Sequence, residues 1–288
     1  MTNVLILGGS GKIGLEIQNR NNIFFTKTYF KNILKNGIKF DILNDQIENI
    51  DHVSSYDCYI IMSAISEPEQ CFLNEKLSKQ INVIKTKELI LQLKKYGKKI
   101  IFFSTEYIYD GLTGNYKENS NANPINLYGT QKLEVENYIR RNIQNHCILR
   151  IAKTYSSKIG NSSLVSNWYN QVCIQNLKTF KVASDQFFSP LFVIDIEKVL
   201  ELIINKNFIG TINLGGPDKL SRIDYFKIFI SKIEKKDIHI QKVKLSDFIK
   251  NEKLPLVTTF NTSKLKNFIN FKMTNFENGV KKFLENVN

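Results

Sequence analysis

We expect an α/β protein built on a doubly wound parallel sheet, with a smaller lobe in the C-terminal half of the chain. Two observations lead to this fold class. Short apolar runs alternate with longer segments of helical periodicity through the first half, which is the pattern of β-α-β units. Three glycines, Gly8, Gly11 and Gly14, follow the first apolar run with the spacing G-x-x-G-x-x-G. A glycine-rich turn after a strand is typical of Rossmann-type sheets.

The predicted strands are continuous apolar runs. A run that is apolar at nearly every position indicates a strand buried on both faces, as in a parallel sheet covered by helices. The first run, residues 3–9, ends in two glycines. Similar runs are residues 22–29, 56–64, 98–105 and 146–152. We expect these runs to pair in the sheet.

Segments of helical periodicity separate the runs. One helix is expected to open at the glycine turn, and a long helical segment covers residues 69–97, where Gly97 ends it. Another helix contains Tyr128 and precedes the last of the five runs. Strands that alternate with helices are joined by crossovers, so neighbouring strands should be parallel.

The second half of the chain is less regular. It predicts helices at residues 163–176 and 221–233 and a strand at 210–216. Residues 180–205 predict a short strand, a turn at Ser189-Pro190 and a helix.

We therefore expect two regions. Residues 1–154 should form a Rossmann-type NAD(P)-binding domain, with its sheet completed by segments within 181–215. Residues 155–288 should form mainly a substrate-binding lobe.

Composition excludes several classes of protein. The chain has 288 residues, of which 42% are hydrophobic and 23% charged, as in ordinary folded proteins. No apolar stretch is long enough to cross a bilayer, and the first residues lack the basic and small-residue features of a signal peptide. Four scattered cysteines and three separated histidines predict no disulfide framework and no metal site. We expect a cytoplasmic protein.

The net charge of +13 raises the question of nucleic-acid binding. The basic residues do not gather in one arm or patch, and the densest cluster, residues 93–99, reads as a solvated helix end before a strand. We expect no nucleic-acid partner and no membrane partner. Attraction for anionic metabolites fits the charge better.

The glycine turn predicts a dinucleotide site. Its glycines allow a tight turn and a close approach of a pyrophosphate to backbone N–H groups. We expect contacts from Gly8, Ser10, Gly11, Lys12, Ile13 and Gly14.

The residues after the second strand favour NADP over NAD. NAD sites place a carboxylate about twenty residues beyond the glycine turn, whereas this chain has Lys27 and Lys31 there. Cations suit a 2′-phosphate, so we expect NADP, with NAD as the alternative. Asp41 and Ile42 follow a short predicted third strand, where we expect them to contact the adenine.

Tyr128 and Lys132 are four residues apart on a predicted helix, so their side chains share one face. An ammonium close to a phenol favours the phenolate and lowers the pKa of the tyrosine. Such a tyrosine can transfer protons near neutral pH. A polar helix face is the structural alternative for this spacing.

Together with the glycine turn, several segments resemble the extended short-chain dehydrogenase/reductase family, and more narrowly its dTDP-4-dehydrorhamnose reductase group. The similarity extends over nearly the whole chain. The segments that carry it include LGGSGKIG, MSAISEPEQC, FFSTEYIYDG, PINLYGTQK and VASDQFFSP.

The resemblance implies an NADP(H)-dependent reductase of a 4-keto, nucleotide-linked deoxysugar, with a role in polysaccharide biosynthesis. It implies that Thr105 hydrogen-bonds the substrate oxygen, that Tyr128 donates the proton, and that Lys132 supports Tyr128 and binds the nicotinamide ribose. Charge on the oxygen during hydride transfer requires such a proton donor. It also implies that the backbone of Ser63, Ala64 and Ile65 passes beneath the cofactor.

The resemblance implies a set of substrate-binding residues as well. These are Glu106, Tyr107, Asp185, Gln186, Ser189 and Arg222. Two departures affect this set: Glu106 stands where the family commonly has an aspartate, and residues 151–154 lack the usual aromatic residue.

The same residues bear on three other functions. A dehydratase would carry a second carboxylate after Glu106, and this chain has Tyr107 there. A nucleotide-sugar epimerase and a non-catalytic NADP-binding regulatory subunit, like that of methionine adenosyltransferase, remain alternatives. We expect a nucleotide-sugar substrate and a homodimer, because dimers are the commonest soluble assembly.

Overall fold

Seven parallel strands form the centre of the fold in the computed structural model, which describes residues 1–160, 163–233, 235 and 237–287. The strand order is β11-β6-β5-β4-β1-β2-β3. This confirms the predicted α/β class with its doubly wound parallel sheet. The strands are β1 (Thr2–Leu7), β2 (Ile23–Tyr29), β3 (Ile38–Lys39), β4 (Cys58–Ile61), β5 (Lys99–Thr105), β6 (His146–Ile151) and β11 (Gly210–Leu214).

The continuous apolar runs are buried as expected. Every residue of β4 and of β5 is buried, and so is the second part of β1, from Val4 to Leu7. Such strands need cover on both faces. Because β1, β4, β5 and β6 are parallel, their carboxyl ends lie at the same edge of the sheet.

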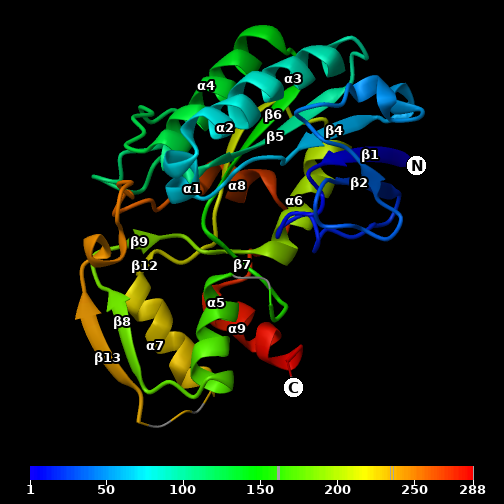
Figure 1. Ribbon diagram of the computed structural model, residues 1–288. Coiled ribbons are helices and arrows are strands. Elements are labelled where there is room, and N and C mark those ends of the chain that lie inside the picture. Colours follow the sequence, from blue (N-terminus) through cyan, green and yellow to red (C-terminus); the bar gives the residue numbers. More distant parts are fainter. Residues whose placement is uncertain (161–162, 234, 236, 288) are drawn as a thin grey trace.

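Helices cover the two faces (Figure 1). One face packs α3 (Thr86–Lys94) and α4 (Leu127–Asn142) through residues such as Leu89 and Val135. The other face packs α6 (Val193–Asn205) and α8 (Ser263–Phe268) through residues such as Ile196 and Leu265. Two distinct apolar layers thus hold the sheet.

The helical segment at 69–97 is not one continuous helix. It consists of α1 (Pro68–Leu73), α2 (Glu75–Lys79), a π-helical stretch (Gln80–Lys85) and α3. Asn74 leaves helical geometry with φ −124° and ψ 50°. π-Helical stretches often occur at functional sites, and this one carries Asn82 toward the cofactor region.

The helix expected directly after the glycine turn is absent, and this prediction was wrong. Residues 8–16 form turns, with the Leu15 N–H donating to the Gly11 carbonyl at 2.9 Å. Asparagines stop a helix from continuing. Asn19 accepts the Phe25 N–H at 2.8 Å, and Asn21 adopts φ 45°, so the chain turns back into β2.

The remaining elements form a smaller region below the sheet in Figure 1, around an aromatic cluster in which Trp168 contacts Phe226 and Phe229. Its helices are α5 (Leu164–Tyr169), α7 (Arg222–Ile233) and α9 (Phe276–Glu285). Its paired strands are β8 (Thr179–Ala183) with β13 (His239–Val243), β9 (Phe187–Phe188) with β12 (Leu220–Ser221), and β7 (Thr154–Tyr155) with β10 (Leu191–Phe192).

Short helical turns complete the described elements. They are 3₁₀ helices at Ile47–Asn49, Val53–Ser55, Glu106–Ile108 and Leu245–Phe248, and a π-helical stretch at Asn170–Ile174. The division into residues 1–154 and 155–288 stays a prediction. Within the described part of the chain, none of the helices combines the length and apolar character needed to cross a membrane.

Candidate active site

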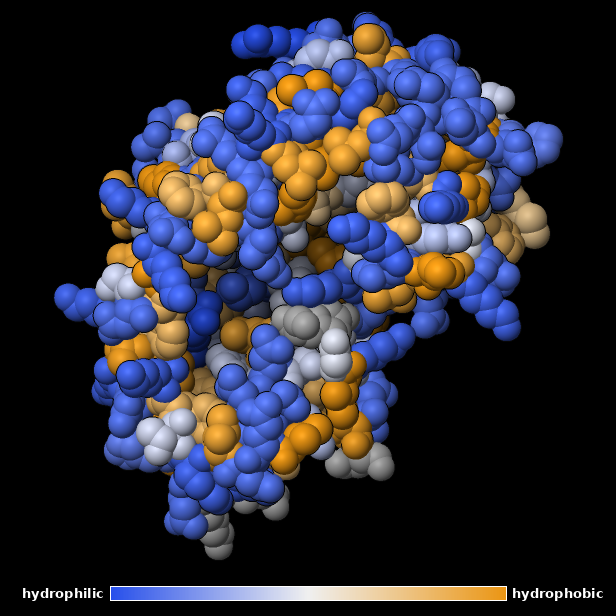
Figure 2. All heavy atoms as spheres, in the orientation of Figure 1, coloured by the Kyte–Doolittle hydropathy of each residue, from blue (hydrophilic) through white to orange (hydrophobic). Residues whose placement is uncertain are grey.

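A cleft of about 820 Å³ lies at the carboxyl ends of the central strands. It is lined by Gly8 after β1, Met62 after β4, Thr105 at the end of β5 and Ile151 at the end of β6. In Figure 2 the surface is hollowed between the upper and lower parts of the molecule, with hydrophilic residues along the rim. Ligands of open α/β sheets bind at this edge.

The glycine turn fits a dinucleotide. Gly8 adopts φ +88°, and a Cβ there would lie 2.6 Å from the Ser63 nitrogen. A Cβ on Gly14 would lie 2.5 Å from the Gly9 carbonyl oxygen, so these two glycines are required by the turn itself. A Cβ on Gly11 would meet only the Gly8 oxygen, at 3.4 Å. Gly11 therefore leaves open cleft space where a pyrophosphate can approach the backbone.

The other predicted residues of the turn also line the cleft. These are Ser10, Lys12 and Ile13. The residues that follow form turns and no regular helix. An anion at this place would therefore meet backbone N–H groups and the Lys12 ammonium, with little contribution from a helix dipole.

The segment after β4 lies beside the glycine turn. Ala64 lines the cleft, and Ser63 packs against Gly8. Asn82 holds Ile65 in place: its side chain accepts the Ile65 N–H at 2.8 Å and donates to the Ile65 carbonyl at 2.9 Å. It also donates to the Gln131 side chain on α4 at 2.7 Å. We did not predict this role of Asn82, although a buried asparagine inside a helical segment is an unusual choice.

Tyr128 and Lys132 both face the cleft from the first turns of α4. Asn126 caps the helix by accepting the Gly129 N–H at 2.8 Å. Gly129 is needed because a Cβ there would lie 2.1 Å from the Tyr107 carbonyl oxygen. The structure thus brings the two predicted residues together, with 8% of Tyr128 and 3% of Lys132 exposed.

The ammonium of Lys132 does not point at the phenol. It donates to the Phe103 carbonyl at 2.9 Å and lies 5.9 Å from the ring centre of Tyr128. Burial lowers the pKa of Lys132 to about 8.

The predicted lowering of the tyrosine pKa is wrong for this state of the protein. Burial raises the pKa of Tyr128 above its ordinary value, and nearby Cys71 and Tyr107 add to the effect. Only a polar contact with Thr105 acts in the opposite direction. The phenol of Tyr128 is therefore protonated at neutral pH, which suits a proton donor.

Thr105 both caps a short helix and lines the cleft. Its side-chain oxygen accepts the Tyr107 N–H at 3.2 Å and so caps the 3₁₀ helix Glu106–Ile108. It also lines the cleft beside Tyr128. A ketone oxygen held between these two hydroxyls would have a hydrogen-bond donor on each side.

The predicted substrate-binding residues fall into two groups. Glu106 and Tyr107 line the cleft, and Arg222 lines an adjoining hollow. Gln186 is buried and accepts the Arg222 Nε–H at 2.8 Å, so it positions that guanidinium.

The other two substrate-side residues do not line either space. Asp185 accepts the Leu245 N–H at 2.8 Å, and Ser189 is fully buried and accepts the Phe260 N–H at 3.3 Å. Both accept backbone N–H groups, so their side chains stabilise the backbone.

The predicted residues for the adenosine end also lie outside the cleft lining. Lys27 donates to the Ile17 carbonyl, and Lys31 is exposed. Asp41 accepts the Leu43 N–H at 3.0 Å, and Ile42 packs on the core. The structure instead places Asn32 in the cleft lining, and no motif pointed to this residue.

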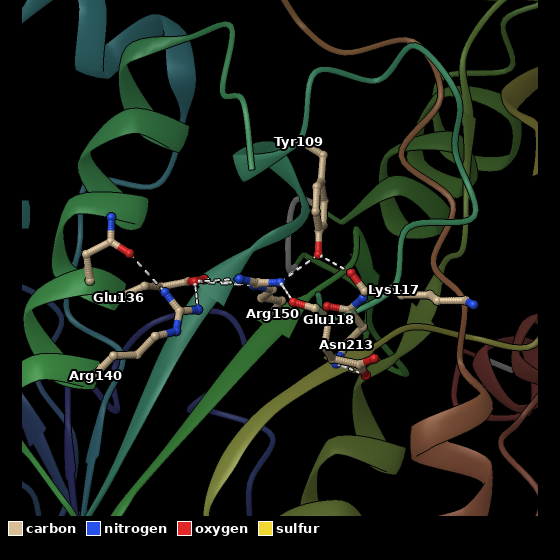
Figure 3. A network of polar contacts seen from close by, with 8 residues as sticks. Tyr109, Lys117, Glu118, Glu136, Arg140, Arg150 and Asn213 are labelled. Carbon is tan, nitrogen blue, oxygen red and sulfur yellow. Dashed lines mark hydrogen bonds and ion pairs between the residues drawn. The ribbon is translucent and has the colours of Figure 1, made fainter. Parts of the chain in front are cut away.

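A buried polar network fixes α4 to the sheet (Figure 3). Glu136, one turn beyond Lys132, accepts hydrogen bonds from Arg150 on β6 at 2.8 Å and from Arg140 at 2.5 Å. Arg150 also donates to the Tyr109 hydroxyl at 2.6 Å. The face of α4 that carries Tyr128 and Lys132 is thereby tied to the strands beneath it. Within the described residues, no cluster of three or more His, Cys, Asp or Glu side chains is placed to hold a metal ion.

A parallel sheet with a glycine turn after β1 and a tyrosine–lysine helix beside the cleft defines a Rossmann-type protein of the extended short-chain dehydrogenase/reductase class. The family model described as "RmlD substrate binding domain" matches residues 1–288. The chain therefore belongs to that family.

Solved structures share the fold over nearly the whole chain. A dTDP-4-dehydrorhamnose reductase of Bacillus anthracis in complex with NADP is 23% identical, with a TM-score of 0.85 and 99% of each chain covered. A dTDP-4-dehydrorhamnose reductase ortholog of Clostridium acetobutylicum is 22% identical, with a TM-score of 0.86 and 99% of each chain covered. Among curated proteins, the methionine adenosyltransferase 2 subunit beta of Bos taurus is 26% identical over 77% of this chain and 69% of that protein.

Proposed function

We propose that the protein is an NADP(H)-dependent reductase of a 4-keto, nucleotide-linked deoxysugar. The observation that carries this proposal is the meeting of Thr105, Tyr128 and Lys132 in the cleft that also contains the glycine turn. Membership in the RmlD substrate binding domain family supports a sugar-nucleotide substrate.

The three side chains have separate tasks in this proposal. Thr105 and Tyr128 orient the ketone oxygen, and Tyr128 gives it the phenolic proton as negative charge develops. Lys132 binds the ribose of the nicotinamide nucleotide with its ammonium donors and supplies positive charge beside the phenol. When bound, the reduced nicotinamide supplies the hydride.

NADP is the proposed cofactor, with NAD as the alternative. The similar reductase of Bacillus anthracis was crystallised with NADP. The residues that follow β2 include no carboxylate to bind a 2′-hydroxyl: they are Phe30, Lys31 and Asn32. Lys31 is exposed at this position and is the cation that can reach a 2′-phosphate.

The test is NADPH oxidation with a 4-keto nucleotide sugar. We expect turnover by the wild type and a loss of about 10²–10⁴-fold in Tyr128→Phe, because a positioned proton donor contributes that much. NADPH affinity, measured by fluorescence titration, should stay within a few-fold. Tyr138→Phe, on the same helix but outside the cleft lining, is the matched control. A Tyr128→Phe variant as active as this control would remove Tyr128 from the mechanism.

A binding subunit is the second candidate function. The similarity to the methionine adenosyltransferase 2 subunit beta favours it. Such a protein would bind NADP without consuming NADPH in the presence of any keto sugar. An epimerase, the remaining alternative, would convert the sugar with no net loss of NADPH.

A further inference from the structure

Three charged side chains from distant segments gather where the cleft meets a smaller hollow. The hollow has a volume of about 350 Å³ and shares part of its lining with the cleft. Lys153, which follows β6, lines both spaces. Glu106 lines the cleft, and Arg222, at the start of α7, lines the hollow. The carboxylate and the two cations therefore face connected ligand space.

Glu106 attracts both cations, and its charge partly offsets theirs. Among the residues that the structure describes, neither Lys153 nor Arg222 forms an ion pair. Arg222 donates its Nε–H to a neutral acceptor, the Gln186 side chain. Glu106 Oε2 is buried without a hydrogen-bond partner. The group thus contains an unfilled acceptor and two cations that lack a close counter-ion.

Lys153 and Arg222 are half-buried, and this partial loss of water disfavours their charged forms when no ligand is bound. Burial and the charge of Arg222 together lower the pKa of Lys153 to about 8, against the attraction of Glu106. Burial also lowers the pKa of Arg222. Buried charges in proteins are normally paired or bound to a ligand. With one carboxylate against two cations, the missing partner is an anion.

The position of the group indicates which part of a substrate supplies that anion. Glu106 directly follows Thr105, and Lys153 lines the same cleft as Tyr128. Thr105 and Tyr128 are the residues proposed to hold the reacting ketone. Lys12 and Ile13 of the glycine turn also line the hollow. The attraction between Lys153 and Glu106 nevertheless ties Lys153 to the side of the cleft that is proposed to hold the ketone.

We propose that Lys153, together with Arg222, binds a carboxylate carried by the sugar of the substrate. The preferred substrate is then an acidic nucleotide-linked keto sugar. A carboxylate accepts strong charge-assisted hydrogen bonds from an ammonium, and a neighbouring sugar hydroxyl donates to Glu106 Oε2. This inference rests on the proposed reduction of a nucleotide-linked keto sugar, and it places a carboxylate on that sugar where a 6-deoxysugar has a methyl group.

Two stable probes test it: UDP-glucuronate and UDP-glucose, which differ only in the group at carbon 6. Their affinities are measured by calorimetry with the full chain and excess NADP⁺. We expect UDP-glucuronate to bind about 10- to 100-fold more tightly, which corresponds to one charge-assisted contact of about 1.5–3 kcal/mol. Lys153→Met should abolish the preference, and Lys153→Arg should retain it. In the wild type the preference should fall as pH rises above about 8.

Lys158→Met is the matched control, because Lys158 is an exposed lysine of the same cleft. It should change both affinities by the same factor. Equal wild-type affinities, a preference that survives Lys153→Met, or binding of neither probe would each overturn the proposal. Equal weakening of both probes by Lys153→Met would assign Lys153 to the diphosphate instead. Binding requires no turnover, so absence of reductase activity would refute the proposed function without affecting this result.

Discussion

Lys132 carries the clearest signature of a functional side chain at the scale of single residues. Its ammonium is almost fully buried, and the hydrogen bond that it donates to the Phe103 carbonyl does not neutralise the charge. Burial lowers its pKa to about 8, against the opposing charges of Cys71 and Glu136. Groups with strongly shifted pKa values in a cleft are candidates for function. Its burial should therefore reduce the stability of the cofactor-free protein.

We expect Lys132→Met to be more stable than the wild type at pH 7. The unfolded chain binds the lysine proton more tightly than the folded chain between pH 8 and 10.5, so wild-type stability rises with pH across this window. The variant lacks this dependence. Its advantage should reach about 3 kcal/mol at pH 7, at 1.36 kcal/mol per pKa unit, and shrink toward pH 10.5.

Urea unfolding at several pH values measures this difference. Lys94→Met, an exposed lysine on α3, is the control and should give a small offset that does not change with pH. A Lys132→Met variant with the same pH profile as the wild type would show that Lys132 is solvated.

The glycine turn sets the next scale, that of elements. Two of its positions require glycine for different physical reasons. A Cβ on Gly14 would clash with the Gly9 backbone at 2.5 Å, whereas a Cβ on Gly11 would meet only the Gly8 oxygen, at 3.4 Å, and would occupy cleft space. We expect Gly11→Val to weaken NADPH binding at least ten-fold and to change the melting temperature little. Gly14→Ala should reduce both binding and melting temperature. Fluorescence titration and thermal unfolding separate the two effects, and equal melting-temperature losses would contradict this assignment.

Helix α4 depends on the buried Glu136–Arg150 pair. Burial raises the pKa of Glu136, but the hydrogen bonds and charge of Arg150 outweigh it and hold the pKa below the ordinary value of 4.5. Glu136→Ala leaves Arg150 buried and unpaired, so we expect a loss of about 3–5 kcal/mol in the free energy of unfolding at pH 7. The loss should diminish as pH falls below 4.5, where the wild type in turn loses the contribution of this carboxylate.

The control lies on the same helix. Glu134 pairs with Lys87 at the surface, so Glu134→Ala should cost only about 0–1 kcal/mol. Similar losses for the two variants in urea unfolding at pH 7 would mean that the buried network does not anchor α4.

The strands could be predicted because each is a continuous apolar run, which local sequence reveals. The break at Asn74 and the π-helical stretch could not, because Asn82 is placed by its bonds to Ile65 and Gln131, which are distant in sequence. The helix after the glycine turn was predicted from the motif, but the asparagines before β2 prevent it. Local sequence patterns thus predicted the strands, but they did not predict the features that depend on contacts between distant residues.

The candidate site shows the same division. Thr105, Tyr128 and Lys132 were found by spacing and resemblance, and the structure brings them together. Asn32 and Lys153 were missed as site residues. Lys153 faces Glu106 and Arg222 only after β5, β6 and α7 meet in space. A lysine-rich chain offers no sequence signal that separates such a residue from its many exposed lysines.

At the scale of the whole molecule, the cleft and the adjoining hollow lie between the sheet and the smaller region, and residues of both regions line them. Glu16, after the glycine turn, accepts hydrogen bonds from Ser156 and Ser157, including one of 3.1 Å from the Ser157 hydroxyl. Arg222 approaches from α7 on the far side of the cleft. The cofactor turn, the tyrosine–lysine helix and the proposed sugar site are thus parts of one connected space.

The central claim is that hydride passes from NADPH to a ketone of a nucleotide sugar in this space. The most direct measurement uses NADPH deuterated at the transferable position of the nicotinamide, with a 4-keto nucleotide sugar and mass spectrometry of the product. The account predicts one deuterium in the sugar for each NADPH consumed, and it predicts that Tyr128→Phe forms very little labelled sugar in the same time. A converted sugar without deuterium would identify an epimerase. Tight NADPH binding with no change in any sugar would contradict catalysis and identify a binding subunit.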